Sequence, residues 1–124
     1  MAGERVLIVE DNEKNTKLFR DVLQAAGYVT LEAATGEDAI ELAVAHEPAL
    51  VLMDVQLPGI DGVETLGRLR GDERTATIPV VALTAQAMSG DRERFLDVGF
   101  DGYLSKPIDI VELIQAVREW CDRG

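Results

Sequence analysis

The sequence predicts an α/β protein with a doubly wound, five-stranded parallel sheet, and three observations support this fold class. Short apolar segments alternate with helical patterns along the whole chain, as they do where helices cover both faces of a parallel sheet. Residues 6–9, 50–53 and 80–83 are apolar at every position, which is typical of strands buried on both sides. Four of the segments lead into polar residues, which parallel strands would bring to one edge of the sheet.

The first two strand and helix units are delimited by their apolar patterns. A strand over residues 6–9 precedes a helix that Gly27 is well placed to end. Residues 29–33 alternate in polarity, which indicates a strand nearer an edge of the sheet. Thr35 and Asp38 have the spacing of an N-terminal cap and predict the start of the second helix. The expected core positions of these two helices are Leu18, Phe19, Val22, Leu23, Ala26, Ala39, Ile40 and Ala43.

The remaining units follow the same pattern to the end of the chain. Strands are predicted over residues 50–53, 80–83 and 102–105, and Pro79 sets the entry of the second of these. Two more helix starts are marked by capping pairs, namely Asp61 with Glu64 and Asp109 with Glu112. The expected core positions of the last helix are Ile110, Ile114, Val117 and Cys121.

Length and composition restrict the classes of protein that fit. A chain of 124 residues has the size of one domain, so we expect a single domain over residues 1–124 with no effector domain. No apolar stretch approaches the roughly 20 residues of a membrane helix or the pattern of a signal peptide, which indicates a cytoplasmic protein. One cysteine excludes an intramolecular disulfide. A formal charge of −11 disfavours nucleic-acid and anionic membrane partners, and His46 is expected at the surface.

Charged and hydroxyl side chains lie at the carboxyl ends of the predicted strands. Glu10 and Asp11 follow the first strand, Asp54 the third, Thr84 the fourth and Lys106 the fifth. Because such ends meet at one edge of a parallel sheet, these side chains should converge on one crevice. Hard oxygen ligands suit Mg²⁺, which takes one or two carboxylates together with phosphate oxygens. The set therefore predicts phosphoryl chemistry.

Four motifs resemble those of the receiver domain of two-component response regulators. They are Val-Glu-Asp-Asn at 9–12, Met-Asp-Val-Gln-Leu-Pro-Gly at 53–59, Leu-Thr-Ala at 83–85 and Tyr-Leu-Ser-Lys-Pro at 103–107. The resemblance covers the chain in order and is greatest to single-domain regulators and to the receivers of hybrid kinases. It implies a flavodoxin/CheY-like (βα)5 fold with strand order 2-1-3-4-5.

The resemblance also implies a role for each residue of the crevice. Asp54 would accept a phosphoryl group, as carboxylates do in aspartyl-phosphate enzymes. Mg²⁺ would be held by Asp11, Asp54 and the backbone carbonyl of Gln56, with Glu10 acting through water. Lys106 would pair with Asp54 and then with a phosphoryl oxygen. In similar proteins the Lys106–Pro107 bond is cis.

A conformational switch and a set of partners follow from the same resemblance. Thr84 would move toward the phosphoryl group, Ala85 would leave room for it, and Tyr103 would turn inward, changing a protein-binding surface. The phosphoryl donor would be a sensor histidine kinase or a histidine phosphotransfer protein, and the output a downstream protein target. Asn15 is a candidate docking residue on the first helix. The domain would not be a conventional enzyme, although it would catalyse its own phosphorylation and dephosphorylation.

Several alternatives remain open at this level. Glu10 and Asp11 could cap the first helix, whose dipole favours negative charge, and Asp54 could simply begin a turn. A haloacid-dehalogenase-like phosphohydrolase also uses a strand-end Asp, but it needs a second Asp where this chain has Gln56. The chain could also be a phosphate-independent receiver-like binding module or a receiver excised from a hybrid kinase.

Overall fold

The predicted α/β architecture is confirmed by the computed structural model, which describes residues 3–84 and 96–122. A five-stranded sheet has the order β2-β1-β3-β4-β5, and every neighbouring pair is parallel. The elements are β1 (Arg5–Val9), α1 (Glu13–Ala25), β2 (Val29–Ala33), α2 (Gly36–His46), β3 (Leu50–Asp54), α3 (Gly62–Arg70), β4 (Val80–Thr84), β5 (Gly102–Ser105) and α5 (Ile110–Asp122). The implied (βα)5 fold has a further helix between β4 and β5, and residues 85–95 of that segment lie outside the described part.

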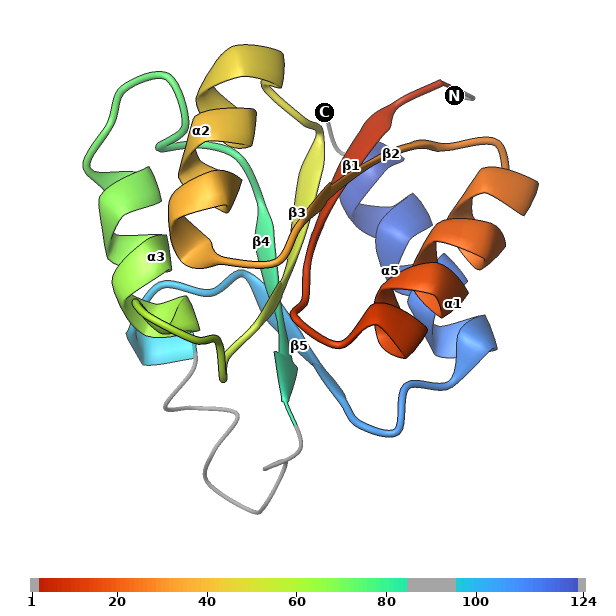
Figure 1. The fold of residues 1–124 in the computed structure, drawn as a ribbon. Coiled ribbons are helices and arrows are strands. Elements are labelled where there is room, and N and C mark those ends of the chain that lie inside the picture. Colours follow the sequence, from red (N-terminus) through yellow and green to blue (C-terminus); the bar gives the residue numbers. More distant parts are fainter. Residues whose placement is uncertain (1–2, 85–95, 123–124) are drawn as a thin grey trace.

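Two helical layers enclose the sheet. Figure 1 shows α2 and α3 on one face and α1 and α5 on the other. The side chains of β1 from Val6 onward, and those of β3 and β4, are buried throughout, because each face of these central strands has a helix over it. Full burial of one such apolar side chain is worth about 1.5–3 kcal/mol, so these three strands supply much of the stability. β2 lies at an edge, as its alternating pattern predicts.

Two predicted core positions are wrong. Leu18 is 41% exposed and Ile110 is 46% exposed. In α1 the buried side chains Phe19 and Leu23 are four residues apart, and Leu18 lies on the flank of that stripe. Ile110 is the first residue of α5, so no preceding helical turn covers it, and Leu113 takes the core position instead, at 1% exposed.

The helix starts are as predicted, with one correction. Asn12 caps α1, because its Oδ1 accepts hydrogen bonds from the backbone N–H groups of Lys14 at 3.0 Å and Asn15 at 3.2 Å. The alternative in which Glu10 and Asp11 cap this helix is therefore wrong. The predicted caps of α2, α3 and α5 are confirmed, and their residues are Thr35, Asp61 and Asp109.

Three smaller expectations also hold. Gly27 follows the end of α1 with a φ of 98°, a left-handed conformation that glycine adopts without strain. His46 is exposed at the end of α2, and Cys121 is buried in the core at 6% exposed. Within residues 3–84 and 96–122, the helices are too short or too polar to cross a lipid bilayer.

Candidate functional site

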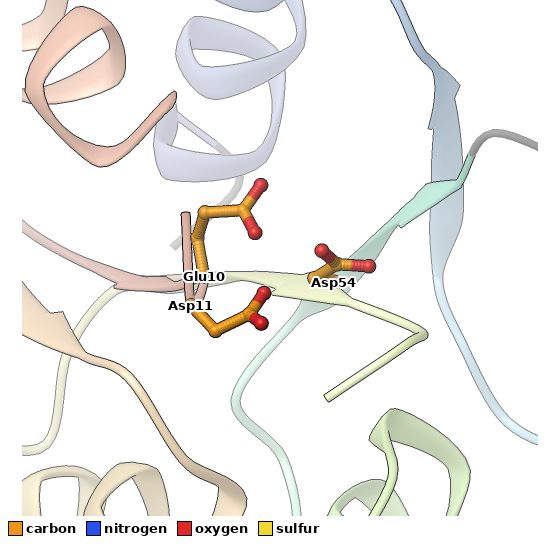
Figure 2. A group of neighbouring side chains, drawn as sticks. All are labelled: Glu10, Asp11 and Asp54. Carbon is orange, nitrogen blue, oxygen red and sulfur yellow. The ribbon is translucent and has the colours of Figure 1, made fainter. Parts of the chain in front are cut away.

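The predicted crevice forms where the strand order reverses, between β1 and β3, which is where open α/β sheets bind their ligands. Val9 pairs with Met53, so the next residues, Glu10 and Asp54, stand level at the carboxyl ends of these two strands. Asp11 follows directly. Carboxylate oxygens of Glu10, Asp11 and Asp54 all lie within 4.8 Å of one another, and Figure 2 shows the three side chains gathered at this edge.

Lys106 joins this cluster from the loop after β5. Its Nζ donates to Asp54 Oδ2 at 2.8 Å and to Glu10 Oε1 at 2.9 Å. The backbone N–H of Lys106 donates to the carbonyl of Thr84 at 2.7 Å, and the bond to Pro107 is cis, as the resemblance implied. Burial of the ammonium works to lower its pKa, but the hydrogen bonds that it donates to Asp54 and Glu10 outweigh burial and raise the pKa of Lys106 above its usual value.

Asp54 is the central carboxylate of the cluster and is only 5% exposed. Its Oδ1 accepts a hydrogen bond from the backbone N–H of Gln56 at 2.9 Å, so both of its oxygens have a donor. The start of α3 lies directly behind it, because a Cβ on Gly62 would stand 2.6 Å from the carbonyl oxygen of Asp54. Only glycine fits at this position, and α3 thereby holds the end of β3 in place. The side chain of Gln56 is exposed.

Glu10 is held by three donors and is 2% exposed. Besides Lys106, its Oε1 accepts from Asn15 Nδ2 at 3.1 Å, and its Oε2 accepts from the backbone N–H of Asn12 at 3.4 Å. Sequence reasoning placed Asn15 at a docking surface and missed this contact. The five-residue distance from a strand end to the first turn of the following helix is the signal that could have indicated it.

The predicted switch residues are partly described. Thr84 is the last residue of β4 and is 4% exposed. Leu83 pairs with Asp54, so Thr84 stands one position farther along the crevice. Tyr103 is half-buried and packs against the core beneath α2 and α3. Ala85 lies outside the described residues.

Among the described residues, three carboxylates gather in the crevice around one ammonium, so these charges do not balance. Each buried carboxylate must be offset by a partner or a bound cation, because a low-dielectric environment penalises isolated charge. Asp11 is exposed, and beside it a cavity of about 480 Å³ opens between α1 and the end of β2. A hard divalent cation that accepts carboxylate oxygens and retains water fits this donor set.

Comparison with known proteins agrees with this geometry. Residues 6–118 match the family model described as "Response regulator receiver domain", a range that contains all four sequence motifs. The polar-differentiation response regulator DivK of Brucella ovis is 47% identical over 115 residues, covering 93% of this chain and 94% of that protein.

Two solved structures share the fold over nearly the whole chain. The receiver domain of the sensor histidine kinase PA1611 from Pseudomonas aeruginosa, with a magnesium ion coordinated in its active-site cleft, superposes with a TM-score of 0.89 at 36% identity, covering 98% of this chain and 99% of that one. A response regulator from Chloroflexus aurantiacus, described as putative, gives 0.90 at 33% identity, covering 97% and 98%.

Proposed function

Because this chain belongs to the response regulator receiver domain family, we propose that it is a cytoplasmic, stand-alone response regulator that takes a phosphoryl group onto Asp54. The observation that carries this proposal is the contact of 2.8 Å between Lys106 Nζ and Asp54 Oδ2, inside a cluster of three carboxylates. A cation held against the acceptor is ready to stabilise the charge that develops on the incoming phosphoryl group.

The reaction needs few chemical roles from the protein. A carboxylate oxygen of Asp54 attacks the phosphorus of a partner's phosphohistidine, and the bond between phosphorus and the imidazole nitrogen breaks. The imidazole leaves with the electron pair and takes up a proton, while the phosphoryl group becomes an acyl phosphate. Lys106 transfers its hydrogen bond from the free carboxylate to a phosphoryl oxygen. Later hydrolysis of the acyl phosphate returns Asp54 to its resting form.

Mg²⁺ is the proposed cofactor, and it would neutralise the crowded carboxylates and the incoming phosphoryl oxygens. Asp11, Asp54 and the backbone carbonyl of Gln56 would hold it, with Glu10 contributing through water. Two points support this assignment. The donor set is made of hard oxygens, and the PA1611 receiver has a magnesium ion coordinated in its active-site cleft.

The proposed output is a change of protein-binding surface. Thr84 would donate its hydroxyl hydrogen to a phosphoryl oxygen, Ala85 would give that group room, and Tyr103 would turn further into the core. The strand-end place of Thr84 and the half-buried ring of Tyr103 support this assignment. Driving such an element from mostly off to mostly on takes about 5.5 kcal/mol of differential stabilisation.

The proposed partners are proteins. A histidine kinase is the general partner of a receiver domain, and the donor here would be a sensor histidine kinase or a histidine phosphotransfer protein. A downstream protein would read the phosphorylated state. A single-domain arrangement over residues 1–124 is supported by the DivK match, which covers 94% of that regulator. The net charge of −11 makes a nucleic-acid target unfavourable.

The proposal is tested with acetyl phosphate as the phosphodonor. We expect one Mg²⁺-dependent phosphate per chain by intact mass, mapped to Asp54 and abolished by Asp54→Asn. The matched control is Asp21→Asn, since Asp21 is an exposed carboxylate on α1 and that variant should be phosphorylated like the unmodified protein. Absence of any adduct, with rapid phosphate release also excluded, would favour the phosphate-independent binding module instead.

A further inference from the structure

The Asn15 side chain is engaged inside the protein, although its residue lies in the first turn of α1. Its Nδ2 donates to Glu10 Oε1 at 3.1 Å, and the contact joins the start of a helix to the residue that directly follows β1. The cap of α1 uses the backbone N–H of Asn15 and not its side chain. The amide group is therefore available for a task other than capping.

Glu10 needs such a contact because its carboxylate is carried on a long, flexible side chain. A glutamate has one more rotatable bond than an aspartate, so its carboxylate has more accessible rotamers. Asn15 and Lys106 lie far apart in the sequence, and both donate to Oε1. Together they fix the position of that oxygen. From the described residues, Oε2 accepts only the long hydrogen bond of 3.4 Å from Asn12 and keeps capacity for a further donor.

We infer that Asn15 is a positioning residue, which fixes the Glu10 carboxylate in the acidic cluster and thereby sets the affinity of the site for Mg²⁺. The inference rests on the proposed function, because it assumes that Glu10, Asp11 and Asp54 serve a metal ion. Without the amide, Glu10 keeps Lys106 and one long backbone contact, and its carboxylate can rotate toward Lys106 and away from Asp11.

Loss of a group that orients a metal-site carboxylate typically lowers metal affinity by about 10–100-fold. Glu10 is expected to act through water and not by direct contact, so the effect of Asn15→Ala should lie at the lower end, about a tenfold rise in the Mg²⁺ dissociation constant. The free energy of unfolding without metal should change little, since alanine keeps the capped backbone and favours helix.

The experiment is titration calorimetry of the metal-free protein with MgCl₂, together with thermal unfolding in the absence of Mg²⁺. Gln24→Ala is the matched control, because Gln24 is a second amide on α1 whose Nε2 donates to Thr30 Oγ1 at 2.9 Å, away from the acidic cluster. We expect Asn15→Ala to bind Mg²⁺ about tenfold more weakly and Gln24→Ala to bind it normally. Asn15→Gln, which retains the donor, should recover part of the loss.

A double-mutant cycle tests whether Asn15 acts through Glu10. Glu10→Asp withdraws the carboxylate from the reach of Asn15, so adding Asn15→Ala to Glu10→Asp should leave the Mg²⁺ dissociation constant unchanged. An equal loss in both backgrounds would overturn the inference, as would normal Mg²⁺ binding by Asn15→Ala. In both cases phosphorylation of Asp54 in the unmodified protein would still stand. Failure of the unmodified protein to bind Mg²⁺ at all would overturn the inference and the proposed metal site together.

Discussion

Salt bridges lie at both ends of the parallel strands, the amino end and the carboxyl end, and they serve different purposes. At the amino end, Arg70 of α3 contacts Asp101 at 2.6 Å, just before β5. At the carboxyl end, Lys106 contacts Asp54 at 2.8 Å and Glu10 at 2.9 Å. Each cation joins segments that are distant in the sequence.

The difference lies in the balance of charge. The remaining donors of Arg70 go to neutral carbonyls, those of Ala76, Ile78 and Gly99, while Asp101 also accepts from the backbone N–H of Val80 at 2.8 Å. The charges of Arg70 and Asp101 therefore cancel within this pair. Among the residues that the structure describes, the carboxyl end sets one ammonium among three carboxylates, which leaves surplus negative charge there. The contacts of Arg70 at the amino end serve stability, whereas the surplus negative charge at the carboxyl end favours a bound cation.

The largest expected effect comes from breaking the amino end. Arg70→Ala should lower the free energy of unfolding by about 3 kcal/mol, because it leaves Asp101 and three carbonyls without their shared donor. Urea unfolding followed by circular dichroism measures this loss, and the slope against urea should stay the same. Mg²⁺ affinity should not change, since Arg70 lies at the amino end of the strands and the crevice lies at their carboxyl end.

Arg68→Ala is the control for that variant. Arg68 lies on the same helix and pairs with Glu64 at 2.8 Å, but both side chains are more than half exposed. Such an exposed pair contributes only about 0.3–0.5 kcal/mol. Equal destabilisation by Arg68→Ala and Arg70→Ala would show that the contacts of Arg70 stabilise the fold no more than an exposed ion pair does.

The second largest effect is expected from replacing the ammonium at the carboxyl end. Lys106→Met should cost about 2 kcal/mol in the absence of metal, because Asp54 and Glu10 lose their common partner. The raised pKa of Lys106 keeps the ammonium charged throughout the neutral range, so the loss should be the same from pH 6 to pH 8. Added Mg²⁺ should recover more stability in this variant than in the unmodified protein. If Mg²⁺ raised the free energy of unfolding equally in both proteins, the carboxyl end would not carry surplus negative charge.

The sequence can predict the contacts at an end of the strands only where a local sequence pattern indicates them. The strand-end residues Asp54 and Lys106 could be placed together from sequence, because parallel strands fix where their carboxyl ends meet. The contacts of Arg70 at the amino end could not, since Arg70 reaches a residue 31 positions later and no periodicity in the sequence reports such a contact.

The same limit applies within the helices. Helix starts could be predicted from capping pairs, because a cap involves residues three apart. The wrong core positions, Leu18 and Ile110, sit at the margin of a stripe or in a first helical turn, where burial depends on what packs alongside. The contact of Asn15 with Glu10 was missed for a related reason, since it depends on the direction in which the chain leaves β1.

A smaller effect is expected from Mg²⁺ itself. At a concentration tenfold above its dissociation constant, binding to the folded state should stabilise the protein by about 1.4 kcal/mol, or about 5 °C in melting temperature. Asp11→Ala should remove most of that rise, because Asp11 is the exposed carboxylate of the cluster. Thermal unfolding with and without MgCl₂ measures both values. A full response in Asp11→Ala would mean that the metal binds elsewhere.

The smallest effect has the opposite sign from an ordinary core substitution. Asp54→Asn removes a carboxylate that is 5% exposed and lies within 4.8 Å of two others, while the amide oxygen can still accept from Lys106 or Gln56. The metal-free protein should therefore become as stable or more stable, by up to about 1 kcal/mol. Urea unfolding in a chelator measures this, with Asp101→Asn as the matched control, which should destabilise because Asp101 balances the charge of Arg70. Destabilisation by both substitutions would mean that the charges at the carboxyl end are as well balanced as those at the amino end. Opposite signs would show that surplus negative charge destabilises the carboxyl end alone.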